Sequence, residues 1–317
     1  MIKTKTVKQN NVSYWLAVGL IAQLMTAPNA SIMKVVLESI DPTTFNTLRA
    51  ALGALIAVPF VIWYWRRINR QNFVYAIGAG LCTAVAVTLT TYAIQSSQAS
   101  YVVVMSLLSP IVLVLLSSYF FHEKVRLRAA AGVTLAALGA FVAIALPLVL
   151  GGHTTFTVYP LATSLILLAS IFLPLATIML RKANEAGLPL TSTQGIASGV
   201  VMVASFLASF ALHGAPVDVS AVPPQVWFGI IYSAVFVIFI ARVFSTASFE
   251  RIGSAATSGL TYLGTIVALM IPIIFLHERL STATIIGGVL ILLGVFLTEH
   301  HRSKHGHHWH FMWHHQA

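Results

Sequence analysis

One apolar segment occurs twice in the chain, and this internal repeat constrains the fold more than any other feature. Residues 120–142 and 275–297 share a His-Glu pair, a basic residue, and then glycines and leucines at matching positions. All seven matched pairs stand at one offset of 155 residues (277 minus 122). They are His122/His277, Glu123/Glu278, Gly132/Gly287, Leu135/Leu290, Leu138/Leu293, Gly139/Gly294 and Phe141/Phe296. The pattern indicates two copies of one helical unit.

Long apolar runs place this repeat in a lipid bilayer. Hydrophobic residues make up 58% of the chain and charged residues only 8%, whereas a soluble domain typically carries about 25% charged residues. A spanning helix needs about 20 mostly apolar residues, while barrel strands are shorter and alternate in polarity. The ten predicted helical spans are 14–33, 44–65, 73–94, 99–121, 129–150, 160–180, 191–212, 225–247, 254–276 and 282–298.

Five spans per copy predict an all-α integral membrane protein, with ten transmembrane helices in two inverted five-helix repeats. The expected organisation is a cytoplasmic segment (1–13), a first repeat (14–150), a second repeat (158–298) and a His-rich cytoplasmic tail (299–317). The basic start weakly resembles a signal peptide, but its apolar run is long and no cleavage site follows. The first helix is therefore expected to remain in the protein.

Lysines and arginines gather in alternate links, and this asymmetry sets the predicted orientation, because basic residues stay on the cytoplasmic side of a membrane. The links assigned to that side contain Lys3, Lys5, Lys8, Arg66, Arg67, Arg70, Lys124, Arg126, Arg128, Arg181, Lys182, Arg251, Arg302 and Lys304. Lys34, Arg49 and Arg279 fall on the other side. Both termini are therefore expected in the cytoplasm of a multi-pass protein of the cell's inner (plasma) membrane. The net charge of +10 then needs no nucleic-acid partner.

The paired segments resemble the drug/metabolite transporter superfamily, in its ten-helix EamA-like branch. The resemblance covers about residues 12–300 and rests on residues 122–125 with Gly132 and Gly139, residues 277–280 with Gly287 and Gly294, and Pro42 and Arg49. It implies a small-molecule transporter whose central cavity lies between the first, third, fourth, sixth, eighth and ninth helices. It does not imply a substrate, because this superfamily moves many metabolites on one scaffold.

The duplicated His-Glu pair has a metal-binding and a structural interpretation. A zinc-protease helix needs a second histidine four residues on, where this chain has Arg126 and Ser281. No metal site is therefore predicted, and each glutamate is expected to stabilise the start of the helix that follows it. The glycines that recur seven residues apart are expected to let helices pack closely, within one chain or against a second.

The substrate path is expected where polar side chains interrupt the apolar spans. An amide or a phenol in hydrocarbon is costly unless it is paired or hydrated, whereas serine and threonine can bond to their own helix. On the helices that the resemblance implies, the predicted substrate-binding residues are Gln23, Asn29, Tyr101, Ser106, Tyr232, Arg242 and Tyr262. Arg242 is the preferred contact, because ionisable residues inside spans mark functional sites; snorkelling, or pairing with Glu250, is the alternative.

Three further charged residues are predicted to form a gate or ion pairs. Lys34 and Glu38 stand four residues apart at the end of the first span and are expected to pair. Arg49 is expected to pair with Glu38 or with Asp41. A weaker match at an offset of 148 residues (182 minus 34) aligns Lys34 with Lys182.

The charges inside the spans also guide the prediction of function. No carboxylate lies at the centre of a predicted span, which disfavours a proton-coupled drug exporter. Embedded positive charge suits a zwitterion or an anion. The sequence predicts a secondary transporter or facilitator that exports a small polar metabolite, such as an amino acid or related carboxylate, by alternating access. The alternative is a non-transporting sensor or scaffold that uses the His-rich tail. No enzyme activity, cofactor or metal is expected, and the protein is expected to be a monomer or a homodimer.

Overall fold

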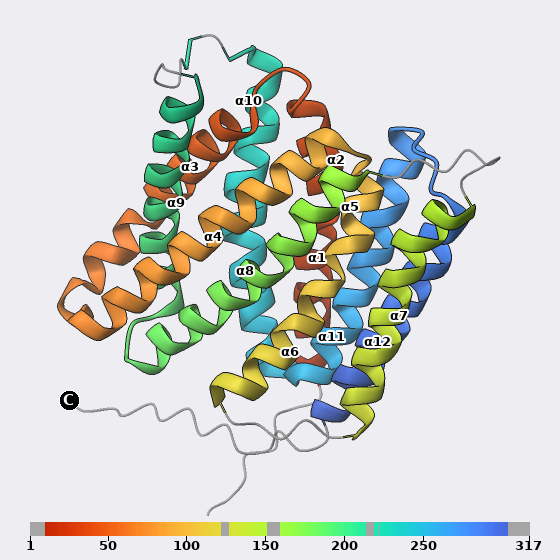
Figure 1. Cartoon of the computed structure of the whole chain (residues 1–317). Helices are drawn as coiled ribbons and strands as arrows, with labels where there is room; N and C mark the ends of the chain where they lie inside the picture. Colours follow the sequence, from red (N-terminus) through yellow and green to blue (C-terminus); the bar gives the residue numbers. More distant parts are fainter. Residues whose placement is uncertain (1–9, 122–126, 151–158, 214–218, 221, 304–317) are drawn as a thin grey trace, which may run out of the picture.

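A computed structural model describes residues 10–121, 127–150, 159–213, 219–220 and 222–303. These residues are almost entirely helical, with no strand among them (Figure 1). The helices are α1 (Asn10–Thr26), α2 (Asn29–Val36), α3 (Pro42–Trp63), η1 (Trp65–Arg67), α4 (Arg70–Ser96), α5 (Ala99–Ser106), α6 (Leu108–Phe121), α7 (Leu127–Leu150), α8 (Pro160–Glu185), α9 (Leu190–His213), α10 (Pro224–Ile231), η2 (Tyr232–Ala241), α11 (Arg242–Phe275) and α12 (Thr282–Ser303).

Ten apolar stretches of these helices overlap the ten predicted spans. Within the described residues, 6 helices are long and apolar enough to cross a membrane, and shorter apolar helices cover the other four spans. Large apolar side chains point outward from the bundle, among them Leu55, Phe141 and Phe228, whose exposed fractions are 67%, 68% and 72%. An outer surface of this kind suits lipid rather than water.

Two spans are broken by proline. The first changes from α1 to α2 around Pro28, and the fourth changes from α5 to α6 just before Pro110. Proline lacks the N–H that would bond to the carbonyl four residues earlier, so the helix kinks or breaks there. The first break leaves the Met25 carbonyl oxygen to accept a bond from the Tyr232 hydroxyl, at 2.6 Å.

Helix α11 folds back on itself and supplies parts of two spans. A Cβ added to Gly19 of α1 would lie 2.5 Å from Ser248 Oγ and 2.7 Å from Leu260 Cδ1. In a straight helix those two residues would stand about 18 Å apart, at about 1.5 Å per residue. The chain therefore reverses between them, and both limbs pack on α1. This reversal separates the eighth span from the ninth, as the sequence predicts.

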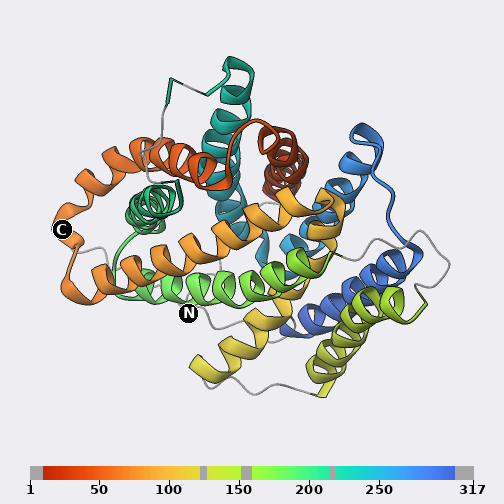
Figure 2. The same ribbon diagram turned by 45° about the horizontal axis from the view of Figure 1, so that its top comes forward.

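Corresponding helices of the two repeats pack against each other in opposite directions. A Cβ added to Gly139 of α7 would lie 2.7 Å from the Gly287 oxygen, and one added to Gly294 of α12 would lie 2.5 Å from the Gly132 oxygen. The earlier glycine of one helix thus meets the later glycine of the other, so α7 and α12 are antiparallel and close (Figures 1 and 2). The repeats are inverted, and the recurring glycines join them within one chain.

The second and seventh spans show the same relationship. The Ser192 hydroxyl at the start of α9 donates to the Phe60 oxygen near the end of α3, at 3.0 Å. Further along α9, Ser198 lies beside Gly53, which is earlier in α3. The most extensive of the other contacts also join the two repeats: α4 packs on α8, and α1 packs on η2 and α11. The third span of one repeat thus packs on the first span of the other, in both directions.

Candidate functional site

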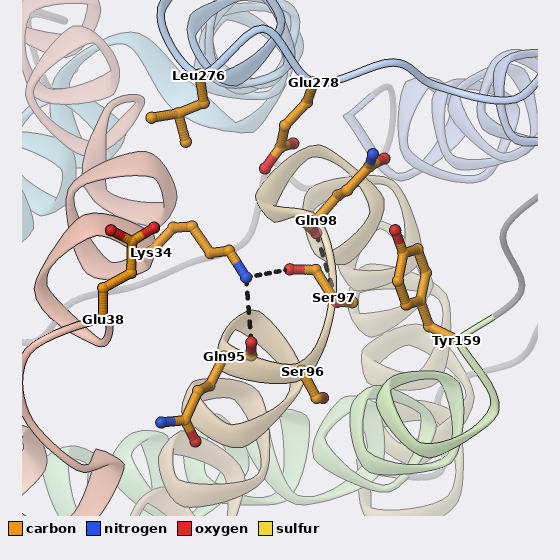
Figure 3. Close-up of a pocket in the computed structure, with 9 residues that line it drawn as sticks. All are labelled: Lys34, Glu38, Gln95, Ser96, Ser97, Gln98, Tyr159, Leu276 and Glu278. Atoms are coloured by element: carbon orange, nitrogen blue, oxygen red, sulfur yellow. Dashed lines mark hydrogen bonds between the residues drawn. The ribbon is translucent and has the colours of Figure 1, made fainter.

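A polar cavity opens at the end of the bundle where α2, α4 and α11 end, which we call the distal end; the opposite end is the proximal end. The cavity has a volume of about 370 Å³. It lies between α2, the link from α4 to α5, the start of α8 and the link from α11 to α12 (Figure 3). Its lining includes Lys34, Glu38, Gln95, Tyr159 and Glu278, so both repeats contribute polar side chains.

Lys34 caps the end of another helix. Its ammonium donates to the carbonyl oxygens of Ile94, Gln95 and Ser97, at 3.1, 3.1 and 2.7 Å. The last carbonyls of a helix have no partner within it, and they carry the negative end of the helix dipole. This cap replaces the ion pair that the sequence predicts between Lys34 and Glu38. Helix α2 ends at Val36, so Glu38 lies beyond the helix and is exposed.

Glu278 caps the start of a helix from the other repeat. Its carboxylate accepts bonds from the backbone N–H groups of Ala99 and Ser100, both at 2.8 Å, and from the Ser100 hydroxyl at 2.5 Å. The sequence predicts that Glu278 supports the helix that follows it. That helix, α12, is instead started by Ser281, whose hydroxyl oxygen accepts from the Thr284 N–H at 3.1 Å. The carboxylate therefore stabilises α5 through the helix dipole.

A second cavity, of about 320 Å³, lies at the proximal end beside the end of α8. Its lining includes Gln71, Tyr75, Lys182 and Glu185. The Lys182 ammonium lies 5.9 Å from the centre of the Tyr75 ring. Lys182 is the residue that the weaker repeat aligns with Lys34, so equivalent lysines line cavities at opposite ends. Glu123, the counterpart of Glu278, lies outside the described residues.

Arg49 lies at the centre of a buried polar cluster between the two cavities. Its side chain is 7% exposed. Its Nη1 donates to Ser233 Oγ at 3.2 Å and to Met33 Sδ at 3.7 Å, its Nη2 donates to Asn46 Oδ1 at 3.0 Å, and its guanidinium stacks on the Phe45 ring at 4.9 Å.

These partners are all neutral, which corrects the predicted pairing of Arg49 with Glu38 or Asp41. Asp41 instead caps the start of α3, where its carboxylate accepts from the N–H groups of Thr43 and Thr44 at 2.9 and 3.0 Å. The polar cluster includes one of the predicted substrate-binding residues, because Asn29 Oδ1 accepts from Ser233 Oγ at 3.1 Å.

Asn46 is fully buried, and of its two side-chain amide atoms only the oxygen makes described hydrogen bonds. Its Oδ1 accepts from Arg49 and, at 3.1 Å, from the Thr91 hydroxyl. Arg49 can only donate, so its bond fixes which way the amide faces, whereas the single Thr91 hydroxyl hydrogen is shared with the Val87 oxygen at 2.7 Å. Its Nδ2 consequently makes no hydrogen bond within the described part of the chain. A buried donor left in this state costs about 1–3 kcal/mol.

Tyr101 and Ser106, both predicted to bind substrate, lie on α5, and their described hydrogen bonds go to other residues than the members of this cluster. The Tyr101 hydroxyl bonds to Thr163 Oγ1 at 2.6 Å, and its ring packs on Tyr159, 5.5 Å away between centroids. Tyr101 thus packs against Tyr159, a residue that lines the distal cavity. The Ser106 hydroxyl donates back to the Val103 oxygen of its own helix at 2.8 Å.

The remaining predicted residues lie around α1 and α11. Gln23 lies beside Gly264, where an added Cβ would meet its side chain at 2.8 Å. Tyr232 binds the Met25 carbonyl, as described above. Arg242 is the first residue of α11, and the described contacts of the buried polar cluster centre on Arg49. The side chain of Tyr262 lies outside the described residues.

Sequence reasoning missed Asn46, Thr91 and Ser233 as members of the cluster. Asn46 stands three residues before Arg49, on the same helix face, and this spacing is a signal that the sequence did carry. Thr91 is one of many threonines that can bond to their own helix, as it does to the Val87 oxygen at 2.7 Å, and Ser233 lies in the π-helical segment η2, which has no sequence signature. Helical segments with this wider turn often occur at functional sites.

Metal binding has no support among the described residues, where no group of three or more His, Cys, Asp or Glu side chains could hold an ion. The His-rich tail beyond residue 303 lies outside them.

Comparison with known proteins places these observations in a family. No curated protein matches the chain. Among 28 matching chains of solved structures, one titled "Crystal structure of protein" is 16% identical, with a TM-score of 0.59 over 92% of this chain and 98% of that one. That likeness concerns the fold. The sequence itself matches the EamA-like transporter family over residues 13–145 and 160–299, one match for each repeat. The chain therefore belongs to the EamA-like transporter family, of the drug/metabolite transporter superfamily.

Proposed function

We propose that this multi-pass membrane protein is a secondary transporter or facilitator that exports a small polar metabolite, an amino acid or related carboxylate, by alternating access. The observation that carries this proposal is the pair of polar cavities at opposite ends of the bundle. Each is lined by an equivalent lysine, Lys34 or Lys182, from one of two inverted repeats. Inverted repeats allow one site to open to either side in turn, because each repeat can take the conformation of the other.

The polar groups of the interior support this class of substrate. The buried polar cluster carries the positive charge of Arg49 with neutral partners, and the distal cavity carries the ammonium of Lys34. An anion or a zwitterion gains from both. An organic cation would be repelled by both, since like charges at close range cost several kcal/mol in a site of low polarity.

Reconstitution of the full chain in liposomes tests the proposal. Vesicles are loaded with an unlabelled amino acid or dicarboxylate, and uptake of the same labelled solute is followed with no pH or voltage difference. A facilitator gives transient, saturable uptake driven by the internal solute, and protein-free vesicles do not. Absence of such exchange for every solute of the panel contradicts the proposal.

A pH step in the same vesicles distinguishes a facilitator from a proton-coupled exporter. We expect the step to change the rate of exchange without driving accumulation above equilibrium. Accumulation above equilibrium that is abolished by Glu38→Gln identifies proton coupling through that exposed carboxylate.

A further inference from the structure

The buried polar cluster offers more hydrogen-bond donors than its described acceptors use. A guanidinium has five N–H groups, and the described contacts of Arg49 use three of them, on Met33, Ser233 and Asn46. The Nδ2 of Asn46 is buried without a partner. The only oxygen that Asn46 offers is already bound by Arg49 and Thr91.

We propose that Arg49 and Asn46 form a subsite that binds the carboxylate of the transported solute, an inference that rests on the proposed function. A carboxylate is an acceptor with no hydrogens, and it can take two parallel bonds from one guanidinium. The unused N–H groups of Arg49 and the free amide N–H groups of Asn46 are the complementary donors. The ligand also supplies the negative charge that the described partners of Arg49 do not.

Burial makes this arrangement costly without a ligand. Removing a charge from water costs several kcal/mol unless a counter-ion or a set of well-placed hydrogen bonds offsets it. If the arginine only tied helices together, a carboxylate in place of the Asn46 amide would offset that cost better, because it would keep both accepted bonds and add a counter-charge. The amide at this position leaves the charge of Arg49 available to a ligand.

The position of the subsite suits a translocated ligand. Arg49 is seven residues into α3, about 10 Å from the distal end of the helix. It contacts Met33, and the next residue of α2, Lys34, lines the distal cavity. Ser233, which accepts from the same Nη1 as Met33, belongs to the second repeat. The proposed subsite therefore joins the two repeats, and it contacts the residue of α2 that precedes Lys34, whose side chain lines the distal cavity.

The decisive variant is Asn46→Asp, which builds the counter-ion into the protein. The new carboxylate keeps the acceptor positions for Arg49 and Thr91, so the fold is retained and the melting temperature in detergent stays the same or rises. It also removes the free N–H groups and neutralises Arg49, so carboxylate binding is weakened. The matched control is Asn184→Asp, the same chemical change on a half-buried side chain at the proximal end of α8, which leaves binding unchanged.

Binding is measured on the purified full chain, as the shift in melting temperature with L-amino acids and dicarboxylates, each paired with its amide. We expect a carboxylate, but not its amide, to stabilise the wild type. Arg49→Gln and Asn46→Asp should weaken its apparent affinity by about 10- to 100-fold, the equivalent of losing bonds to a charged group. Arg49→Lys should recover part of it, because lysine keeps the charge without the planar fork.

Three results overturn the subsite: a carboxylate that binds Asn46→Asp as tightly as wild type, an amide that stabilises the wild type as well as its acid, or no response to any carboxylate. Exchange in liposomes separates this failure from failure of the proposed function. If exchange persists unchanged in the Asn46→Asp protein, the proposed transport function is supported and the proposed subsite is contradicted. If a carboxylate binds in a way that depends on Arg49 but no vesicle shows exchange, the subsite is supported and the proposed transport function is contradicted.

Discussion

Lys34 and Glu278 form hydrogen bonds to opposite ends of one short link, the turn between α4 and α5. The ammonium binds the carbonyls at the end of α4, and the carboxylate binds the N–H groups at the start of α5. Each charge lies at the helix end whose dipole it opposes. The two residues come from different repeats, so a turn of the first repeat is stabilised by the link between the last two spans of the second.

Replacement of Glu278 by glutamine should lower the stability of the protein. Three donors from Ala99 and Ser100 lose a charged acceptor, and a hydrogen bond to a charged group contributes about 1.5–3 kcal/mol. Thermal unfolding in detergent measures the loss. Glu38→Gln is the matched control, because Glu38 lines the same cavity but is exposed. Equal melting temperatures for the two variants would show that the cap does not stabilise the fold.

The contact between α7 and α12 should not tolerate a methyl group. In Gly287→Ala the new Cβ would lie 2.5 Å from the Gly139 oxygen, which forces two backbones apart and costs about 1–3 kcal/mol as overpacking. The control is Gly199→Ala, where an added Cβ meets nothing within 4 Å and the lower flexibility of alanine stabilises a helix by about 0.5–1 kcal/mol. The two variants should therefore shift the melting temperature in opposite directions. A Gly287→Ala protein as stable as wild type would contradict the close packing of α7 and α12.

Asp41 should make the stability of the protein depend on acid pH. Burial alone raises the pKa of its carboxyl, but bonds from Thr43 and Thr44 outweigh burial, so the pKa lies below its usual value near 3.8. A lowered pKa in the folded state means that the stabilisation is fully present above the usual pKa and is lost as the pH falls through the folded one.

The measurement compares the wild type with Asp41→Asn, which keeps a capping side chain but does not titrate there. We expect the difference in melting temperature between the two proteins to be constant from pH 7 to about 5. Below about pH 4 it should change, with the wild type losing stability relative to the variant. A difference that stays constant down to pH 3 would mean that the Asp41 charge contributes nothing to the cap.

The orientation of the chain in the membrane can be tested by cysteine accessibility. The asymmetry of Lys and Arg predicts that the distal end faces outward. In a protein whose one native cysteine, Cys82, is replaced by alanine, a membrane-impermeant thiol reagent added to intact cells should label cysteines at His153 and Val217. Cysteines at Asn69 and Asn184 should be labelled only after the membrane is opened. The reverse pattern would place both termini outside.

Much of the architecture follows from local sequence properties. Ten apolar runs predict the spans within a few residues, because a bilayer imposes one length and one polarity on every helix that crosses it. The repeat predicts the inversion, since an odd number of spans per copy reverses direction. The recurring glycines of α7 and α12 predict a surface for close helix packing, although only the fold shows that the two helices face each other.

Side-chain partners are less predictable. The pairing of Lys34 with Glu38 follows from a continuous helix, but α2 ends before Glu38, and the carbonyls of α4 come within reach only when the helices assemble. In the same way, the sequence favours Arg242 over Arg49 as the substrate contact, and only the fold shows the buried neutral partners of Arg49. Burial depends on which face of a span meets other helices, and the hydropathy of the span does not contain that information.

The sequence by itself determined that this chain is a two-repeat, ten-helix membrane protein, because hydrophobicity, helix length and internal repetition are properties of the chain alone. Only the tertiary structure decided which charges stand at helix ends and which is buried. Lys34, Glu278 and Arg49 are all charged residues in or beside apolar spans, and the sequence does not distinguish their surroundings. They differ because hydrogen bonds between residues more than a hundred positions apart, such as Arg49 with Ser233 and Ser100 with Glu278, form only after the two repeats pack together.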